Sequence, residues 1–315
     1  MSSPSSYAEV DFPVVVRPVS SAQASALRQW AECERGWIDG SLWRHGAVLL
    51  RGFSLPTPGD FEDLCRALAP QLLGYVGGES PRRRVTGLVY TSTEYPSSLE
   101  IPLHGEMSYA GRWPDRIFFH CVEPATAGGE TTIADTRRLL AAIAPEVRDR
   151  FIEKGVMYMR NLHGGWGLGK SWQETYETDD RVEVERRCRE DGFAVRWSDG
   201  GLQTRAVRPA TVRHPQTGEI VWFNQADLWH VSSRGPAAER SLRRVFKEDE
   251  LPRNAYHGDG SPIAAEDLEA IRGASRAVEV AVSWEKGDVL LLDNVLAAHG
   301  RRPFAGPRQV LVAMG

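Results

Sequence analysis

The stretch Ile101-Pro-Leu-His-Gly-Glu-Met-Ser-Tyr109 places a histidine and a glutamate two residues apart, at His104 and Glu106. In an extended segment side chains alternate between faces, so these two would point the same way, while Gly105 would point away or permit a close approach. One short segment would then supply two neighbouring metal ligands. A His-x-Glu tripeptide also occurs in ordinary solvated loops, so this interpretation depends on what accompanies it.

A third candidate ligand, His299, lies near the C-terminus. It follows a Gly-Asp turn at 287–288 and the apolar run 289–292, which predicts a buried strand. The small residues of 295–300 would let the backbone curl towards a metal. Two imidazoles and one carboxylate on one face of a metal form the facial triad of non-haem Fe(II) enzymes, which leaves positions open for a cosubstrate and oxygen.

Arg308 stands nine residues after His299 and opens a second apolar strand, Arg308-Gln-Val-Leu-Val-Ala-Met314. An arginine at the mouth of a buried strand needs an anion to pair with, because an unpaired buried charge is expensive. The planar guanidinium suits a carboxylate. The sequence therefore predicts an anion-binding residue beside the strand that leads to His299.

These segments, together with four others, resemble the Fe(II)/2-oxoglutarate-dependent oxygenases of the TauD/TfdA type. The branch that looks most similar contains clavaminate synthase and the SyrP-like hydroxylases of peptide antibiotic pathways. The resemblance extends from about residue 46 to residue 314, and it implies a double-stranded β-helix, or jelly roll, as the core. The four further segments are Tyr90–Pro96, Gly128–Asp135, His214–Glu219 and Val221–Gln225.

The resemblance implies that His104, Glu106 and His299 ligate Fe(II). It also implies that Arg308 and Thr131 bind the distal carboxylate of 2-oxoglutarate, whose 2-oxo acid end would chelate the metal, and that O2 is the second cosubstrate. An ordinary β-branched strand residue is the alternative interpretation of Thr131. No catalytic residue is expected beyond the metal centre.

The reaction implied is hydroxylation of an unactivated C–H bond in an amino acid or amino-acid derivative, free or tethered to a peptidyl carrier protein, in antibiotic or other specialised metabolism. Desaturation or cyclisation with the same cofactors stays open. So do a cupin-like metal-dependent hydrolase and a non-catalytic jelly-roll binding module. Glu106 argues against halogenation, because halogenating relatives have a small residue there. Gly105 stands where the SyrP-like branch often has Asn, and it removes whatever contact that side chain makes.

Four further residues are candidates for contact with the substrate. Asn224 ends an apolar strand, and its amide needs partners if it is buried. Arg160 also ends a strand and would bind a substrate carboxylate or form only a salt bridge. His163 lies in a Gly-rich loop, with a surface or packing role as the alternative, and Tyr109 ends the segment that carries His104. Arg82-Arg-Arg84 is either a solvated loop or a contact for an anionic substrate group.

The predicted elements follow a mixed order. Many strands, interrupted by helices without regular alternation, favour a mainly β, antiparallel jelly-roll sandwich decorated by helices over a doubly wound sheet. No Gly-x-Gly-x-x-Gly segment opens a helix, so a dinucleotide fold has no support. Strands are predicted at 11–17, 46–53, 116–122, 131–134, 156–160, 194–197, 202–207, 220–223 and 289–292, and helices at 22–38, 58–68, 135–142, 145–154 and, in part, 173–191.

Composition bounds the class of protein. The 315 residues, 42% hydrophobic and 25% charged, are enough for a sizeable core, and we expect a single oxygenase domain over residues 1–315 with residues 1–8 as a frayed terminus. Neither a signal peptide nor a membrane span is recognisable, so a cytoplasmic location without a membrane partner is expected. A net charge of −4 gives no reason to expect a nucleic-acid partner. The sequence does not indicate an oligomeric state. Four scattered cysteines are expected to be free thiols: Cys33, Cys65, Cys121 and Cys188.

Overall fold

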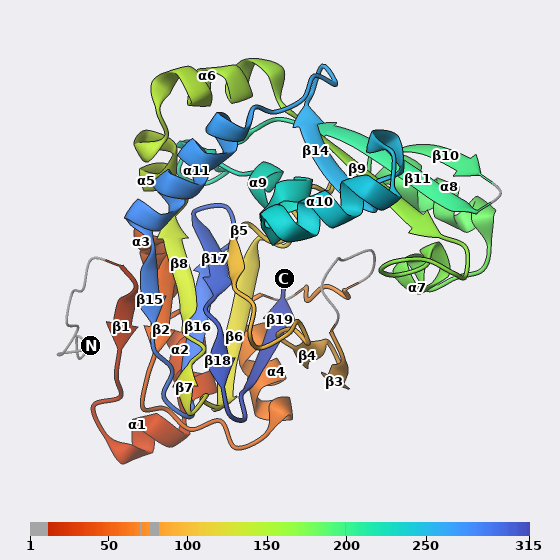
Figure 1. Ribbon diagram of the computed structural model, residues 1–315. Helices are drawn as coiled ribbons and strands as arrows, with labels where there is room; N and C mark the ends of the chain where they lie inside the picture. Colours follow the sequence, from red (N-terminus) through yellow and green to blue (C-terminus); the bar gives the residue numbers. More distant parts are fainter. Residues whose placement is uncertain (1–11, 70, 76–81, 199) are drawn as a thin grey trace.

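The computed structural model describes residues 12–69, 71–75, 82–198 and 200–315. In these residues the largest sheet has seven strands in the order β1-β2-β16-β6-β19-β4-β3 (Figure 1). β1 and β2 are parallel to one another, and the other pairs are antiparallel. The strands are β1 Val14–Val16, β2 Ala47–Leu50, β3 Arg84–Thr86, β4 Val89–Thr91, β6 Arg116–Glu123, β16 Val289–Asp293 and β19 Gln309–Met314.

A second sheet, of four antiparallel strands in the order β15-β8-β17-β5, packs against the first. Side chains from both sheets, among them Phe119, Ile133 and Leu290, form one buried cluster between them. The predicted mainly β jelly-roll core is thereby confirmed. The strands are β5 Ile101–His104, β8 Thr131–Asp135, β15 Val280–Val282 and β17 Ala297–Arg301, and a small separate sheet pairs β7 Ala127–Gly128 with β18 Phe304–Ala305.

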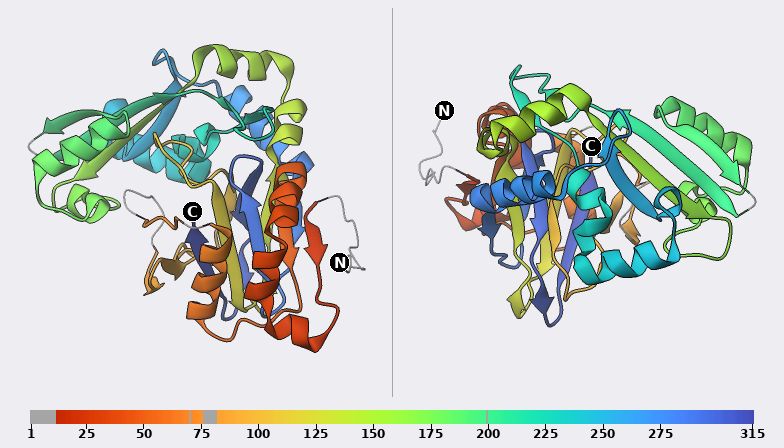
Figure 2. Two further views of the ribbon diagram at one scale, coloured as in Figure 1. Left: turned by 180° about the vertical axis from the view of Figure 1, so that it is seen from behind. Right: turned by 45° about the horizontal axis from the view of Figure 1, so that its top comes forward.

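Helices from the N-terminal part cover the outer face of the large sheet, as the red and orange segments of Figure 2 show from behind. The single helix predicted at 22–38 is wrong, because the backbone leaves helical geometry at Ala26 and Glu34. Each resulting piece has its own boundaries, and the last continues to His45. The helices are α1 Ser21–Ser25, α2 Leu27–Cys33, α3 Arg35–His45 and α4 Pro58–Leu68, and the Thr57 side chain caps the N-terminus of α4.

A third sheet, in the order β10-β11-β9-β14, extends away from one end of the sandwich (Figure 1). Its strands are β9 Val156–His163, β10 Ala194–Ser198, β11 Gly201–Arg208 and β14 Arg253–His257, and a hairpin of β12 Thr211–Arg213 and β13 Ile220–Trp222 lies nearby. The accompanying helices are α5 Thr136–Ala142, α6 Pro145–Lys154, α7 Trp172–Tyr176, α8 Arg181–Glu190, α9 Ala226–Trp229, α10 Pro236–Val245 and α11 Ala265–Val278, with 3₁₀ turns at Val231–Arg234 and Glu248–Glu250.

Several elements were not predicted, among them β14, β17 and α11, and residues 295–300 differ from the prediction. Residues 295–300 do not simply curl, because His299 lies within β17, which pairs with β8 on one side and β5 on the other. The four cysteines are free thiols, as expected. Residues 1–8, expected to fray, and Asp11 of the first predicted strand lie outside the described residues. Throughout the described ranges, each helix is too short or too polar to span a bilayer.

Candidate metal centre

The three predicted metal ligands come together at the end of the second sheet. His104 is the last residue of β5, and His299 lies opposite it on β17. One ligand atom from each of His104, Glu106 and His299 lies within 4.8 Å of the other two. Glu106 and His299 are 4% and 5% exposed. Spacing of this kind suits a single metal ion. Three protein ligands leave coordination positions open for ligands from outside the protein.

The backbone that carries Glu106 is not extended, so side-chain alternation does not explain its position. β5 ends at His104, and the chain enters a turn in which Met107 has a φ of 57°. Asn294 holds this turn, since its Oδ1 accepts from the backbone N–H of Glu106 at 2.7 Å and its Nδ2 donates to the Glu106 carbonyl at 3.0 Å. Asn294 is fully buried and follows β16, so it ties Glu106 to the strand that leads to His299.

Gly105, between the two ligands, lies against an aromatic ring. A Cβ added at this position would lie 2.6 Å from Cε2 of Phe223, which is closer than real contacts of this kind. The carbonyl of Gly105 accepts from Nε2 of Gln225 at 2.6 Å. The ligand segment is therefore held from two sides, and any side chain at position 105 would push it away from Phe223.

The two ligands of the first segment are in the protonation states that a metal requires. Burial, together with the neighbouring His299, lowers the pKa of His104 to about 4. Its Nδ1 donates to the carbonyl of Pro102 at 2.8 Å, which leaves the Nε2 lone pair for a metal. Burial by itself raises the pKa of Glu106, but Arg82 and both histidines outweigh burial, so the pKa lies below its ordinary value.

Thr131 lines a small pocket beside the triad together with Arg308, His104 and His299. Its hydroxyl accepts a hydrogen bond from the indole Nε1 of Trp284 at 3.1 Å. The hydroxyl proton is then left to donate to an anion in the pocket. Trp284 was not predicted as a site residue, because it precedes β16 and its position in the sequence does not indicate a contact with Thr131.

Arg308 is largely buried in the same pocket. Its Nε donates to the carbonyl of Gly129 at 3.0 Å, and its guanidinium lies 5.6 Å from the ring centroid of Phe304. Burial, with repulsion from Arg301, lowers its pKa to about 10. Among the described residues no carboxylate forms an ion pair with Arg308. A cosubstrate that ends in a carboxylate fits this residue, and the donor set of the triad fits Fe(II).

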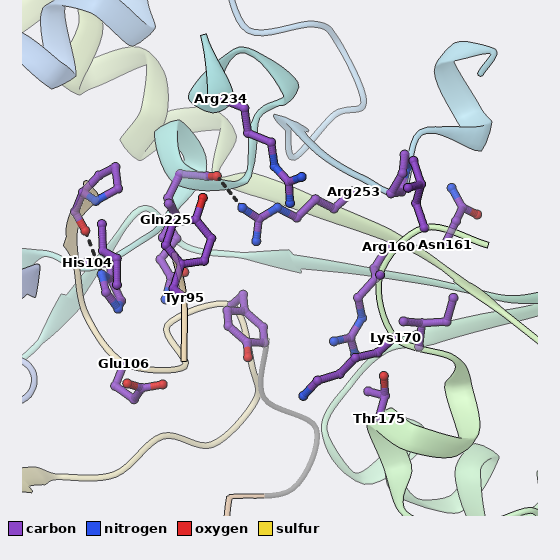
Figure 3. Close-up of a pocket in the computed structure, with 18 of the residues that line it drawn as sticks. Tyr95, His104, Glu106, Arg160, Asn161, Lys170, Thr175, Gln225, Arg234 and Arg253 are labelled. Atoms are coloured by element: carbon purple, nitrogen blue, oxygen red, sulfur yellow. Dashed lines mark hydrogen bonds between the residues drawn. The ribbon is translucent and has the colours of Figure 1, made fainter. Parts of the chain in front are cut away.

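A larger cavity of about 350 Å³ opens on the other side of His104 and Glu106. Figure 3 shows Arg160, Lys170 and Thr175 across the cavity from these two ligands, with Arg234 and Arg253 along another wall. Of the predicted substrate residues, Arg160 and Tyr109 line this cavity, and both are buried. Arg160 also donates from Nη2 to the Tyr176 hydroxyl at 3.5 Å.

The other two predicted substrate residues lie elsewhere. Asn224 is buried, but its Nδ2 donates to the Ala210 carbonyl and its Oδ1 accepts from the Ala226 N–H, so backbone groups use both ends of the amide. Its neighbour Gln225 lines the cavity instead. Asn224 was expected at the cavity, but Gln225 faces it, because the chain turns into α9 at this point.

His163 lines a different surface pocket, and its ring nitrogens contact Gly165 and Gly169 of its own loop. The three arginines at 82–84 also differ from both predicted interpretations. Arg83 and Arg84 are exposed, whereas the side chain of Arg82 is 4% exposed and pairs with Glu106. The segment is therefore partly solvated, at Arg83 and Arg84, and partly paired within the protein, at Arg82.

Comparison with known proteins places the chain in a family. A family model described as taurine catabolism dioxygenase TauD, TfdA family, matches residues 16–314. The chain is 40% identical over 278 residues to the dapdiamide synthesis protein DdaC of Enterobacter agglomerans, which covers 88% of this chain and 84% of that relative. It is 31% identical over 326 residues to a clavaminate synthase-like protein of Arabidopsis thaliana, covering 98% of this chain and 94% of the relative.

Solved structures support the fold. The chain is similar to PvcB of Pseudomonas aeruginosa, with a TM-score of 0.53 at 16% identity, covering 96% of this chain and 84% of that one. It is also similar to an asparagine oxygenase, with a TM-score of 0.55 at 13% identity, covering 92% and 78%. With a matching family model over nearly its whole length, the chain belongs to the TauD/TfdA family of dioxygenases and is an oxygenase that uses iron, 2-oxoglutarate and O2.

Proposed function

We propose that this enzyme hydroxylates an unactivated C–H bond of an amino acid or amino-acid derivative, free or carried on a peptidyl carrier protein, in specialised metabolism. His104, Glu106 and His299 would hold the iron, and Thr131 and Arg308 would bind the distal carboxylate of 2-oxoglutarate. The observation that carries the proposal is a closely spaced two-histidine, one-carboxylate set, in which Glu106 and His299 are buried, beside a pocket that Arg308 lines.

When bound, iron with 2-oxoglutarate and O2 supplies the oxidising power for a C–H bond. The chain's own residues hold the metal ligands and the cosubstrate-binding hydroxyl in position. Asn294 fixes Glu106 through its backbone, Pro102 fixes the ring of His104, and Trp284 orients the Thr131 hydroxyl. Because Glu106 and His299 are almost fully buried, little water reaches these two ligands.

The substrate class rests on the cavity and on the relatives. The cavity contains Arg160, Lys170, Thr175 and Gln225, which are groups that bind carboxylates and amides. The similar protein from Enterobacter agglomerans is named for dapdiamide synthesis. Desaturation or cyclisation would use the same residues. We extend the proposal to a cytoplasmic location, in line with four cysteines that are all free.

An anaerobic titration of the protein with Fe(II) and 2-oxoglutarate tests the metal and cosubstrate assignments. The expected result is the weak visible charge-transfer band of the chelate, lost in His104→Ala and kept in His163→Ala, whose histidine lies in another pocket. If the wild-type protein gives no band, or if His104→Ala keeps it, the assignment is wrong.

A screen of amino acids and aminoacyl carrier proteins for substrate-dependent succinate formation tests the substrate class. Succinate release stimulated by one of these compounds, with a product 16 mass units heavier, is the result expected for hydroxylation. A product lighter by two hydrogens would instead indicate desaturation or cyclisation. Succinate formation that no compound of either class stimulates would contradict the proposed substrate class.

A further inference from the structure

Arg82 lies directly beside Glu106, the one carboxylate of the proposed triad. Its Nη2 is 2.6 Å from Glu106 Oε2, and the two side chains are 4% and 5% exposed. A buried pair of this kind is stable only while both partners are present, because each charge has lost its hydration. In this arrangement Arg82 is the counter-cation of Glu106.

The remaining contacts of the Arg82 guanidinium are weak. Its Cζ lies 4.2 Å from the ring centroid of Tyr75, and its Nη1 lies 3.7 Å from Sδ of Met314. Its Nε is buried and has no hydrogen-bond partner among the described residues. Within that part of the chain, Glu106 is the carboxylate with which Arg82 pairs, so losing Glu106 would leave Arg82 in need of another anion.

The Glu106 oxygen that Arg82 contacts is also the oxygen that faces His299. Oε2 of Glu106 lies 3.7 Å from Nε2 of His299. A divalent ion held by Glu106 and His299 would draw on the electron pairs of the Glu106 carboxylate and would repel a guanidinium paired with that carboxylate. Metal binding would therefore weaken the contact between Arg82 and Glu106.

A replacement anion has a place to bind nearby. Arg82 lines the same small pocket as Thr131 and Arg308, together with His104 and His299. 2-Oxoglutarate brings two carboxylates, and the proposed function assigns one to Arg308 and Thr131. The second belongs to the metal-chelating end, beside the triad and therefore beside Arg82. A guanidinium suits this carboxylate because it offers several donors in one plane.

We propose that Arg82 changes partners as the site is filled: it pairs with Glu106 before the metal binds, and with the metal-side carboxylate of 2-oxoglutarate afterwards. This inference rests on the proposed function. Arg82 is then a positioning residue that holds the ligand carboxylate in place without a metal and strengthens cosubstrate binding once the metal is there. Metal and cosubstrate binding become linked through one side chain.

Arg82→Met tests this exchange, because it removes the charge and keeps an unbranched side chain. Arg83→Met is the matched control, since the Arg83 side chain is 75% exposed and pairs with Glu94, at 3.6 Å. Two dissociation constants are measured by anaerobic calorimetry for each protein. One is for Co(II) added alone, and the other is for 2-oxoglutarate added to the Co(II)-loaded protein.

In Arg82→Met we expect Co(II) alone to bind about threefold or more tightly than in wild type, because the guanidinium that competes with the metal for Glu106 is gone. We expect 2-oxoglutarate to bind about tenfold or more weakly, in the range of a lost charge-assisted contact. Arg83→Met should match wild type in both. Arg82→Lys, which keeps the charge with a smaller donor set, should lie between, and it carries the test if Arg82→Met does not fold.

Unchanged 2-oxoglutarate affinity in Arg82→Met overturns the proposal, and so does Co(II) binding that is no tighter than in wild type. Both results leave the proposed function standing if the wild-type protein binds Co(II) and 2-oxoglutarate. If the wild-type protein binds neither, the assignment of the triad fails and the role of Arg82 fails with it.

Discussion

Gly105 joins two ligands that belong to different local structures, the end of a strand and a turn. Its lack of a side chain lets the segment lie against the ring of Phe223 while Asn294 holds the next residue. From the sequence, this glycine was expected only to remove a contact that Asn makes in similar proteins. The structure gives it a positive role, because close packing permits no Cβ here without a shift of the ring or of the ligand segment.

Gly105→Ala should displace the ligand segment, with a loss of unfolding free energy of about 1–3 kcal/mol and a weaker metal site. Urea unfolding and Co(II) calorimetry measure the two effects. Gly105→Ala combined with Phe223→Leu should recover part of both losses, because the smaller side chain gives the added methyl group room. Gly105→Ala with wild-type stability and metal affinity would show that the ring moves freely and that the packing argument is wrong.

Residue identity alone could not separate Asn224 from Gln225. Both are buried amides in one motif, and the direction of each side chain depends on where β13 ends and α9 begins. Trp284 and Asn294 were missed for a related reason. Each acts on a residue more than 150 positions away in the sequence, Thr131 and Glu106 respectively.

The turn between β15 and β16 is fixed by a buried ion pair with the chain that follows β2. Arg51 binds Asp288 through Nε, 3.0 Å from Oδ1, and Nη2, 2.7 Å from Oδ2. Asp288 is fully buried and also accepts from the backbone N–H of Glu285 at 2.8 Å. The sequence predicted this turn from Gly287 and Asp288 but gave no partner for the carboxylate. The pair positions β16, the strand that leads to Asn294 and His299.

Asp288→Ala should lower the unfolding free energy by about 3–5 kcal/mol, because it leaves Arg51 without its buried partner. Glu285→Ala is the control: Glu285 also pairs with Arg51, at 3.0 Å, but its side chain is 58% exposed. For this variant we expect a change of about 1 kcal/mol or less. Urea unfolding at neutral pH measures the loss of unfolding free energy in each variant. Equal losses in Asp288→Ala and Glu285→Ala would show that burial of the carboxylate does not determine its contribution.

At the scale of the whole molecule, histidines buried in different regions make stability depend on pH. Burial lowers the pKa of His104 at the metal centre and of His230 after α9, each to about 4. The unfolded value is about 6.5. Because the folded pKa is the lower one, protonation favours the unfolded chain. Their contribution is complete above pH 6.5 and is lost as the pH falls towards 4.

We therefore expect the metal-free protein to be less stable in urea at pH 5.0 than at pH 7.5. His230→Gln should reduce that difference by about 1 kcal/mol, a value discounted because His230 is partly exposed. A pH dependence that His230→Gln does not alter would show that burial of His230 does not contribute to it.

The sequence by itself determined the class of fold, the two histidines and glutamate of the candidate metal site, and the arginine beside them. Strand patterns and turn residues are local, and the residue types that a metal and a carboxylate require are few. Tertiary structure decided the rest: the turn at Glu106, the strand at His299, the amide clamp of Asn294 and the burial of Arg82. Each depends on a partner that is distant along the chain, and sheet pairing and core packing select that partner, which local propensity does not encode.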